Sequence, residues 1–361
     1  MDTWVPVWVP TAPPTLATLF APTLQPLPVL PALAVVLAVA YLAGAVRMWS
    51  TGRRWSPWAT LSFLTGCAVL VVVMGFGIEG YGLRLFSAFM FQQLTLMMAV
   101  PPLLVLGRPG TLLLRATPHR GVGRVVLRGA YWGLRSRAAR VLLHPAFMVP
   151  LFLVCFYGLY LTDLASSVLS TWVGHTSLEV AFLAAGVLFT AAVLSRDPLP
   201  VRQSHLGRAA DMFLEMPLHA FFGVIVMLSV TPLVTVFAAP PPGWDVDVIA
   251  DQELAGALAW SYGEIPSVLL LLIIFVRWHR AEDRGARARD RHVDQHGDAD
   301  LDAYNAYLHQ LQHRGYWPTT ALLPASTAGA GDDQPLHRKE KTCKPSTTPA
   351  TRPPGVVTAP A

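Results

Sequence analysis

Residues 58–78 read WATLSFLTGCAVLVVVMGFGI, an apolar stretch without a charged side chain. About 20 such residues in a helix cross the hydrocarbon core of a bilayer. Arg53 and Arg54 precede the stretch and Glu79 follows it directly, so charge returns close to both of its ends. This pattern is typical of a transmembrane helix, and it recurs along most of the chain.

The composition of the whole chain is that of a membrane protein. Of the 361 residues, 53% are hydrophobic and 14% are charged, whereas a soluble domain carries about 25% charged residues. We expect no nucleic-acid partner despite the net charge of +5, because Lys and Arg in a membrane protein encode topology. Three widely separated cysteines without a CxxC motif support neither a disulfide scaffold nor a thiolate zinc site.

The fold predicted from these features is an all-α, polytopic membrane helical bundle with seven transmembrane helices. All 27 Lys and Arg residues lie outside the predicted spans. This agrees with the cost of a cation at the bilayer centre, which is roughly 2.5–3.5 kcal/mol on insertion scales. The spans cover residues 27–46, 58–78, 85–106, 145–162, 173–194, 212–237 and 253–276.

The connections between the spans predict the orientation. Three alternate connections hold fourteen arginines, at residues 47–57, 107–141 and 195–211. The segments that alternate with these connections hold one arginine, Arg84. These segments are residues 1–26, 79–84, 163–172 and 238–252. The positive-inside rule then predicts an N-terminus outside and a C-terminus in the cytoplasm. Because the first basic residue is Arg47, we expect no cleavable signal peptide.

Four regions follow from this topology. They are a Pro-rich extracytoplasmic segment (1–26), the transmembrane domain (27–276), a cytoplasmic charged segment with a short helix (277–315) and a disordered tail (316–361). The helix is expected over 298–313, where apolar residues recur every three or four positions. The tail is rich in Pro, Thr, Ala and Gly, which cannot build a packed core.

The long connection 107–141 has two open interpretations. Between Arg124 and Arg140, arginines are interleaved with Val, Leu, Tyr and Trp. That pattern suits a basic amphipathic helix lying on an anionic inner leaflet. It equally suits a solvated connector whose charges serve topology alone.

Ionisable side chains within a span are costly and are therefore candidates for function. In the fifth span His175 and Glu179 are four residues apart and share a helix face. They can share a metal ion or form a hydrogen-bonded pair, and the spacing leaves both open. In the third span, the thioethers of Met90, Met97 and Met98 suit Cu(I) or simple packing. Pro101 and Pro102 predict a kink near the inner end of that span.

Further polar candidates lie in the sixth and seventh spans. They are Glu215 and His219 in the sixth, and Asp251, Gln252, Trp260 and Glu264 around the seventh. Glu264 is expected near mid-membrane, facing the bundle interior, and Gly256 and Gly263 allow close helix approach. The sequence holds no nucleophile–base pair, dinucleotide loop or zincin motif, so we expect no enzyme.

Several motifs occur in a distinctive order between about residues 25 and 280. They are Phe86-Ser87 with Met90 and Gln92, Pro101–Leu104, Leu106–Pro109, His144-Pro145, His175–Phe182, Pro217 with His219-Ala220, and Asp251–Gly256 with Trp260. In order and spacing they resemble the CtaG-type family of cytochrome c oxidase assembly factors.

The resemblance implies a multi-pass protein of the bacterial plasma membrane that helps to mature haem–copper oxidase as a metallochaperone. Copper would be the cargo, membrane lipids the surroundings, and oxidase subunits or a copper donor protein the partners. The family usually carries His-x-x-x-His in the third and fifth spans; here these positions are Phe89 and Gln93, and His175 and Glu179. The candidate metal ligands are therefore His175, Glu179, Met90 and Gln93, with reduced Cu(I) affinity.

The third, fifth and seventh spans all begin at the outer surface in this topology. We therefore expect a polar site open to the outside and formed by these three spans. Two other functions remain open. A transporter of copper or a small solute needs a polar path through the bilayer, and a degenerate, metal-free scaffold agrees with the lost histidines.

Overall fold

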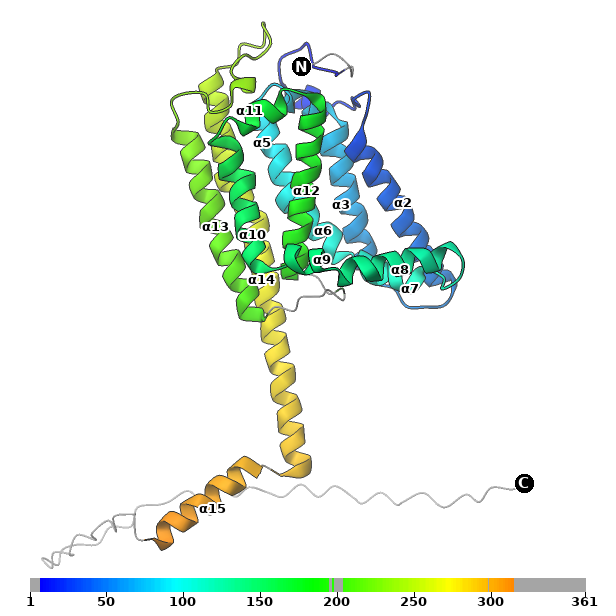
Figure 1. The fold of residues 1–361 in the computed structure, drawn as a ribbon, viewed down its shortest axis with the longest axis vertical. Helices are drawn as coiled ribbons and strands as arrows, with labels where there is room; N and C mark the ends of the chain where they lie inside the picture. Colours follow the sequence, from blue (N-terminus) through cyan, green and yellow to red (C-terminus); the bar gives the residue numbers. More distant parts are fainter. Residues whose placement is uncertain (1–6, 195–196, 198–203, 298, 315–361) are drawn as a thin grey trace, which may run out of the picture. The chain divides into compact units, whose positions relative to one another are not determined.

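A computed structural model describes the chain except for residues 1–6, 195–196, 198–203, 298 and 315–361 (Figure 1). Among the described residues the secondary structure is helical, with no strand. Six helical runs are long and apolar enough to cross a membrane. They are α2 (Val29–Ser50), α3 (Pro57–Gly75), the run over 86–116, α12 (Trp172–Leu194), α13 (His205–Leu228) and α14 (Val248–His296).

The predicted span at 145–162 is a shorter apolar helix. Here α10 (Pro145–Leu153) continues directly into the π-helical turn η2 (Val154–Gly158). It lies within the bundle and contacts α12 and α13 (Figure 1). Its start is capped by the exposed His144, whose Nδ1 accepts a hydrogen bond from the Ala146 amide at 3.2 Å. The all-helical fold is confirmed, and the seventh span stays a prediction.

The regular α-helix of the third span is interrupted directly before its two prolines, near the inner end, as they predict. The span consists of α5 (Phe86–Leu94), the π-helix η1 (Thr95–Ala99) and α6 (Val100–Leu106), and the connection that follows begins with α7 (Pro109–Ala116). Pro101 and Pro102 lie in the first turn of α6, directly after η1. A proline has no amide proton to give to a preceding turn, and the wider π turn accommodates that loss. Arg108, between α6 and α7, has a left-handed backbone conformation with a φ of 52°.

Glycines bring the helices of the bundle into close contact. A Cβ added to Gly186 on α12 would lie 2.3 Å from the Met97 carbonyl oxygen on η1. A Cβ on Gly256 of α14 would lie 2.5 Å from the Met227 amide nitrogen on α13. The close approach predicted at Gly256 is thus confirmed, and backbone contact there leaves no room for any side chain.

The connection 107–141 is helical after α7 as well. It forms α8 (Val122–Arg135) and α9 (Arg137–Leu142). On α8 the apolar side chains of Val122, Val125 and Trp132 are exposed. The segment is helical, and both interpretations of the connection, a helix on the inner leaflet and a solvated connector, stay open.

The N-terminal segment covers the short helix α4 (Gly77–Gly82). Over the described residues 7–26 this segment forms one helical turn, α1 (Leu16–Leu19). The Gly77 amide donates to the Ala21 carbonyl at 2.8 Å, and the Tyr81 hydroxyl donates to the Ala12 carbonyl at 3.0 Å. These contacts hold α4 and the residues around it against the end of the bundle.

The chain divides into two compact units, Met1–Arg291 and His292–Ala361. In the first, α14 runs beyond the predicted span end at 276, because the next residues include many helix-forming Arg and Ala and no proline. In the second, α15 (Ala299–His313) is the helix expected over 298–313. The predicted disordered tail, 316–361, lies outside the described residues.

Candidate metal site

Three buried ionisable side chains converge at one end of α12. One ligand atom each of Glu79, His175 and Glu179 lies within 4.8 Å of the other two. Their residues are 7%, 2% and 3% exposed. We call these three residues the His175 cluster. It brings together the predicted pair and a carboxylate that lies 96 positions earlier than His175 in the chain.

The local sequence of α12 explains how His175 and Glu179 meet. The start of the helix is held by Thr171, whose carbonyl accepts from the His175 amide at 3.0 Å and whose hydroxyl accepts from the Gly174 amide at 3.1 Å. His175 therefore lies in the first turn and Glu179 one turn later on the same face. The His175 Nε2 and Glu179 Oε1 atoms are 2.9 Å apart.

Glu79 reaches the cluster because α3 and α4 are separated at Phe76, which is extended (φ −116°, ψ −178°). Gln92 on α5 fixes the carboxylate by donating from Nε2 to Glu79 Oε2 at 2.6 Å. The Gln92 side chain occupies the space that a side chain on Gly82 would need. Burial raises the pKa of the Glu79 carboxyl well above its ordinary value of 4.5, and the neighbouring Glu179 raises it further.

The polar atoms of this cluster are incompletely paired within the described residues. His175 Nε2, Glu179 Oε1 and Gln92 Oε1 are buried without a well-aligned hydrogen bond. Buried polar atoms in proteins nearly always have a partner, so these atoms are available to a metal ion or to a water molecule. A cavity of about 10 Å³ adjoins Glu79 and Glu179, enough for about one water molecule. One imidazole and two carboxylates therefore fit a metal ion.

Phe89 forms an apolar wall beside the imidazole. Its ring centroid is 5.3 Å from that of His175, at an interplanar angle of 48°. Phe182 and Phe237 pack on the other sides of Phe89 at 6.1 and 5.6 Å. The site is thus closed on this side by aromatic rings.

Two candidate ligands of the third span have other surroundings. Gln93 accepts a hydrogen bond from the Tyr160 hydroxyl, and its Nε2 donates to the Cys155 carbonyl at 3.3 Å. Met90 is fully buried in the apolar core. Gln92, the neighbour of Gln93, is the amide that contacts the His175 cluster.

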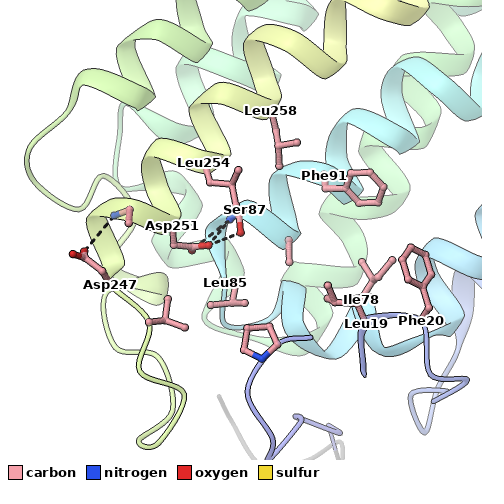
Figure 2. A pocket seen from close by; sticks show the side chains of 14 residues that line it. Leu19, Phe20, Ile78, Leu85, Ser87, Phe91, Asp247, Asp251, Leu254 and Leu258 are labelled. Atoms are coloured by element: carbon pink, nitrogen blue, oxygen red, sulfur yellow. Dashed lines mark hydrogen bonds between the residues drawn. The ribbon is translucent and has the colours of Figure 1, made fainter. Parts of the chain in front are cut away.

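The polar residues at the start of α14 bind neighbouring backbone. The Asp251 carboxylate accepts from the amides of Phe86, at 2.6 Å, and Ser87, at 3.4 Å, and from the Ser87 hydroxyl (Figure 2). The side chains of Asp251 and Ser87 line an apolar pocket of about 520 Å³ (Figure 2). Gln252 accepts from the Leu233 amide at 2.8 Å and donates to the carbonyls of Ser229 and Thr231.

The sequence predicts a site formed by the third, fifth and seventh spans, but the His175 cluster is formed by a different set of elements. The fifth span supplies two groups, the third supplies the supporting Gln92, and the connection after α3 supplies Glu79. Trp260 is half exposed, while His219 and Glu264 form a separate pair with Nε2 and Oε1 3.7 Å apart. The sequence signal for Glu79 is a carboxylate between glycines, GIEGYG, directly after an apolar span.

Comparison with known proteins places this geometry in a family. The model of the cytochrome c oxidase caa3 assembly factor family matches residues 39–281, which include every residue of the His175 cluster. The chain belongs to the caa3 assembly factor family. The resemblance inferred from the sequence is confirmed. No solved structure matches this caa3 assembly factor family member.

Relatives of this family member occur in mycobacteria. Uncharacterised proteins of Mycobacterium bovis and Mycobacterium tuberculosis are each 38% identical over 281 residues, which is 77% of this chain and 42% of theirs. One of Mycobacterium leprae is 36% identical over 284 residues, 78% of this chain and 43% of its own. The chain spans about two fifths of the length of these relatives.

Proposed function

We propose that this protein assists the assembly of a haem–copper oxidase in the bacterial plasma membrane by holding a copper ion for delivery at the His175 cluster. The observation that carries the proposal is the convergence of three buried ligand atoms within 4.8 Å, with His175 Nε2 and Glu179 Oε1 left without an aligned hydrogen bond. Family membership supplies the link to oxidase assembly. The role is one of binding and transfer rather than catalysis.

The donor set favours a divalent ion. Imidazole suits copper and zinc, and carboxylates are harder ligands than the thioethers that select Cu(I). With Phe89 and Glu179 at positions where the family usually has histidine, Cu(II) is the form that this set suits best. Three protein groups leave coordination positions for a ligand from a donor or from the oxidase, which suits transfer.

The proposed topology places the cluster toward the outer surface. We assign α10 with η2 as the seventh span, the N-terminus to the outside and the C-terminus to the cytoplasm. Arginines concentrated in the connections 47–57, 107–141 and 195–211 support this orientation. The arginines and exposed apolar residues of α8 then suit the anionic lipid of the inner leaflet.

Copper stoichiometry of the detergent-purified full chain tests the proposal. We expect about one Cu(II) per chain after dialysis, and its loss in His175→Ala. The matched control is His279→Ala, which removes an exposed histidine that also pairs with a carboxylate four residues on, Asp283 at 3.7 Å. Equal copper in the wild type and both variants would contradict the assignment.

A metal-free scaffold is the second candidate function. It is favoured by the packing of Phe89 on His175, which places an aromatic ring on one side of the imidazole. In that case the purified protein binds no stoichiometric copper and still associates with oxidase subunits. The same dialysis experiment, followed by co-purification with the oxidase, separates the two functions.

A further inference from the structure

A second group of metal-binding side chains lies between η1, α13 and α14. His219 on α13 is 0% exposed and Met98 on η1 is 5% exposed. Glu264 on α14 has Oε1 3.7 Å from His219 Nε2, too far for a hydrogen bond. None of these groups belongs to the His175 cluster.

Gly263 allows His219 and Met98 to pack closely against the α14 backbone. The position that a Cβ would take on Gly263 lies 3.1 Å from His219 Nε2 and 3.3 Å from Met98 Sδ. The nitrogen and the sulfur therefore face one common point beside the α14 backbone. Any larger residue at 263 would place a carbon atom there.

His219 is oriented with one ring nitrogen free for a ligand. Its Nδ1 lies 3.1 Å from the Glu215 carbonyl oxygen, so this bond fixes the tautomer with the proton on Nδ1. The buried Nε2 has no hydrogen-bond partner among the described residues. A neutral imidazole with its backbone-held Nδ1–H directed away is the usual arrangement of a metal-ligating histidine.

Methionine side chains, a small cavity and a buried carboxylate lie close to His219 and Met98. Met98 also lines a cavity of about 20 Å³ together with Met97, Met148 and Glu215, and Glu215 Oε2 is buried and unpartnered. Met97 and Met98 belong to a π-helical turn, a distortion that is frequent at functional sites. Carboxylates within a membrane bundle need a counter-charge.

We propose that Met98 and His219 bind a monovalent soft cation, Cu(I), beside Gly263, with Glu264 as the neighbouring counter-charge. Thioether and imidazole are soft and borderline donors, which select Cu(I) over divalent ions. This site differs in chemistry from the His175 cluster, so it depends neither on that cluster nor on the role in oxidase assembly.

Anaerobic Cu(I) titration of the purified full chain against a chromogenic Cu(I) chelator tests the site. We expect Met98→Leu and Gly263→Ala each to weaken Cu(I) binding at least tenfold, the first by removing the sulfur and the second by filling its space. The matched controls are Met212→Leu, a fully buried methionine of a separate apolar cluster, and Gly133→Ala, which meets open space. His175→Ala should leave Cu(I) affinity unchanged and lower only Cu(II) binding.

X-ray absorption of the Cu(I)-loaded protein gives a second readout that does not depend on affinity. We expect sulfur and nitrogen scatterers in the wild type and loss of the sulfur in Met98→Leu. Failure of the wild type to bind Cu(I), or equal binding in Met98→Leu and wild type, would overturn the proposal. Failure of the wild type to bind Cu(II), with Cu(I) binding retained, would instead count against the His175 cluster.

Discussion

The ring of Phe89 packs against the imidazole of His175, with centroids 5.3 Å apart. Residue 89 is therefore close enough for its side chain to determine the ligands available beside His175. A histidine there would add a second imidazole to one histidine and two carboxylates. A phenylalanine instead closes the site with an apolar wall.

Phe89→His should therefore strengthen Cu(II) binding about tenfold or more, since an imidazole is a good copper ligand and a phenyl ring is none. Competition titration with a Cu(II) chelator measures the change. Phe182→His is the control, because Phe182 packs on Phe89 within the same aromatic group. Equal affinities of Phe89→His and wild type would show that residue 89 does not face the metal.

The fold itself was largely predictable from local sequence. The span at 58–78 was found as α3 because its run of apolar residues is uninterrupted, and Ser56 with Pro57 marks its start. The sequence predicts that His175 and Glu179 lie together because residues four apart on a helix share a face, and their side chains are 2.9 Å apart. Both predictions depend only on the sequence within a single helix.

Contacts between distant elements were not predictable in this way. Glu79 joins the cluster through the break at Phe76 and the fold of α4, which no helical periodicity encodes. Gln92 rather than Gln93 contacts Glu79, and adjacent residues on a helix point about 100° apart, so this depends on the rotation of α5. The continuation of α14 past residue 276 reflects the helix propensity of a segment whose mixed charges end the apolar pattern of the span.

Asp251 should matter for stability rather than for copper. The Asp251 carboxylate on α14 accepts hydrogen bonds from the first two amides of α5. Asp251→Asn should therefore lower the free energy of unfolding by about 1–3 kcal/mol. Thermal unfolding in detergent measures this as a lowered midpoint. Glu253→Gln, an exposed carboxylate two residues on, should leave the midpoint unchanged. Loss of Cu(II) without loss of stability in Asp251→Asn would refute this structural role.

Gly186 should tolerate no side chain. A Cβ at this position would lie 2.3 Å from the Met97 carbonyl oxygen, so Gly186→Ala must separate α12 from η1. We expect a destabilisation of about 1–3 kcal/mol, as for an overpacked core. The control is Gly133→Ala, where the added methyl meets nothing within 4 Å and should raise helix stability slightly. Equal unfolding midpoints for the two variants would contradict the close packing.

The orientation in the membrane can be read from single cysteines. Arg120→Cys and Asp245→Cys, in a chain whose three native cysteines are replaced by serine, should react with an impermeant maleimide from opposite sides. In intact cells or spheroplasts only residue 245 should be labelled, and residue 120 only after permeabilisation. Labelling of both residues from the same side would reject the seven-span topology.

The copper content of the oxidase in a strain lacking this protein tests the central claim most directly. In copper-poor medium the deletion should yield oxidase with depleted copper and low activity, restored by the wild-type gene and by His279→Ala but not by His175→Ala. Fully metallated oxidase in the deletion strain would contradict the account.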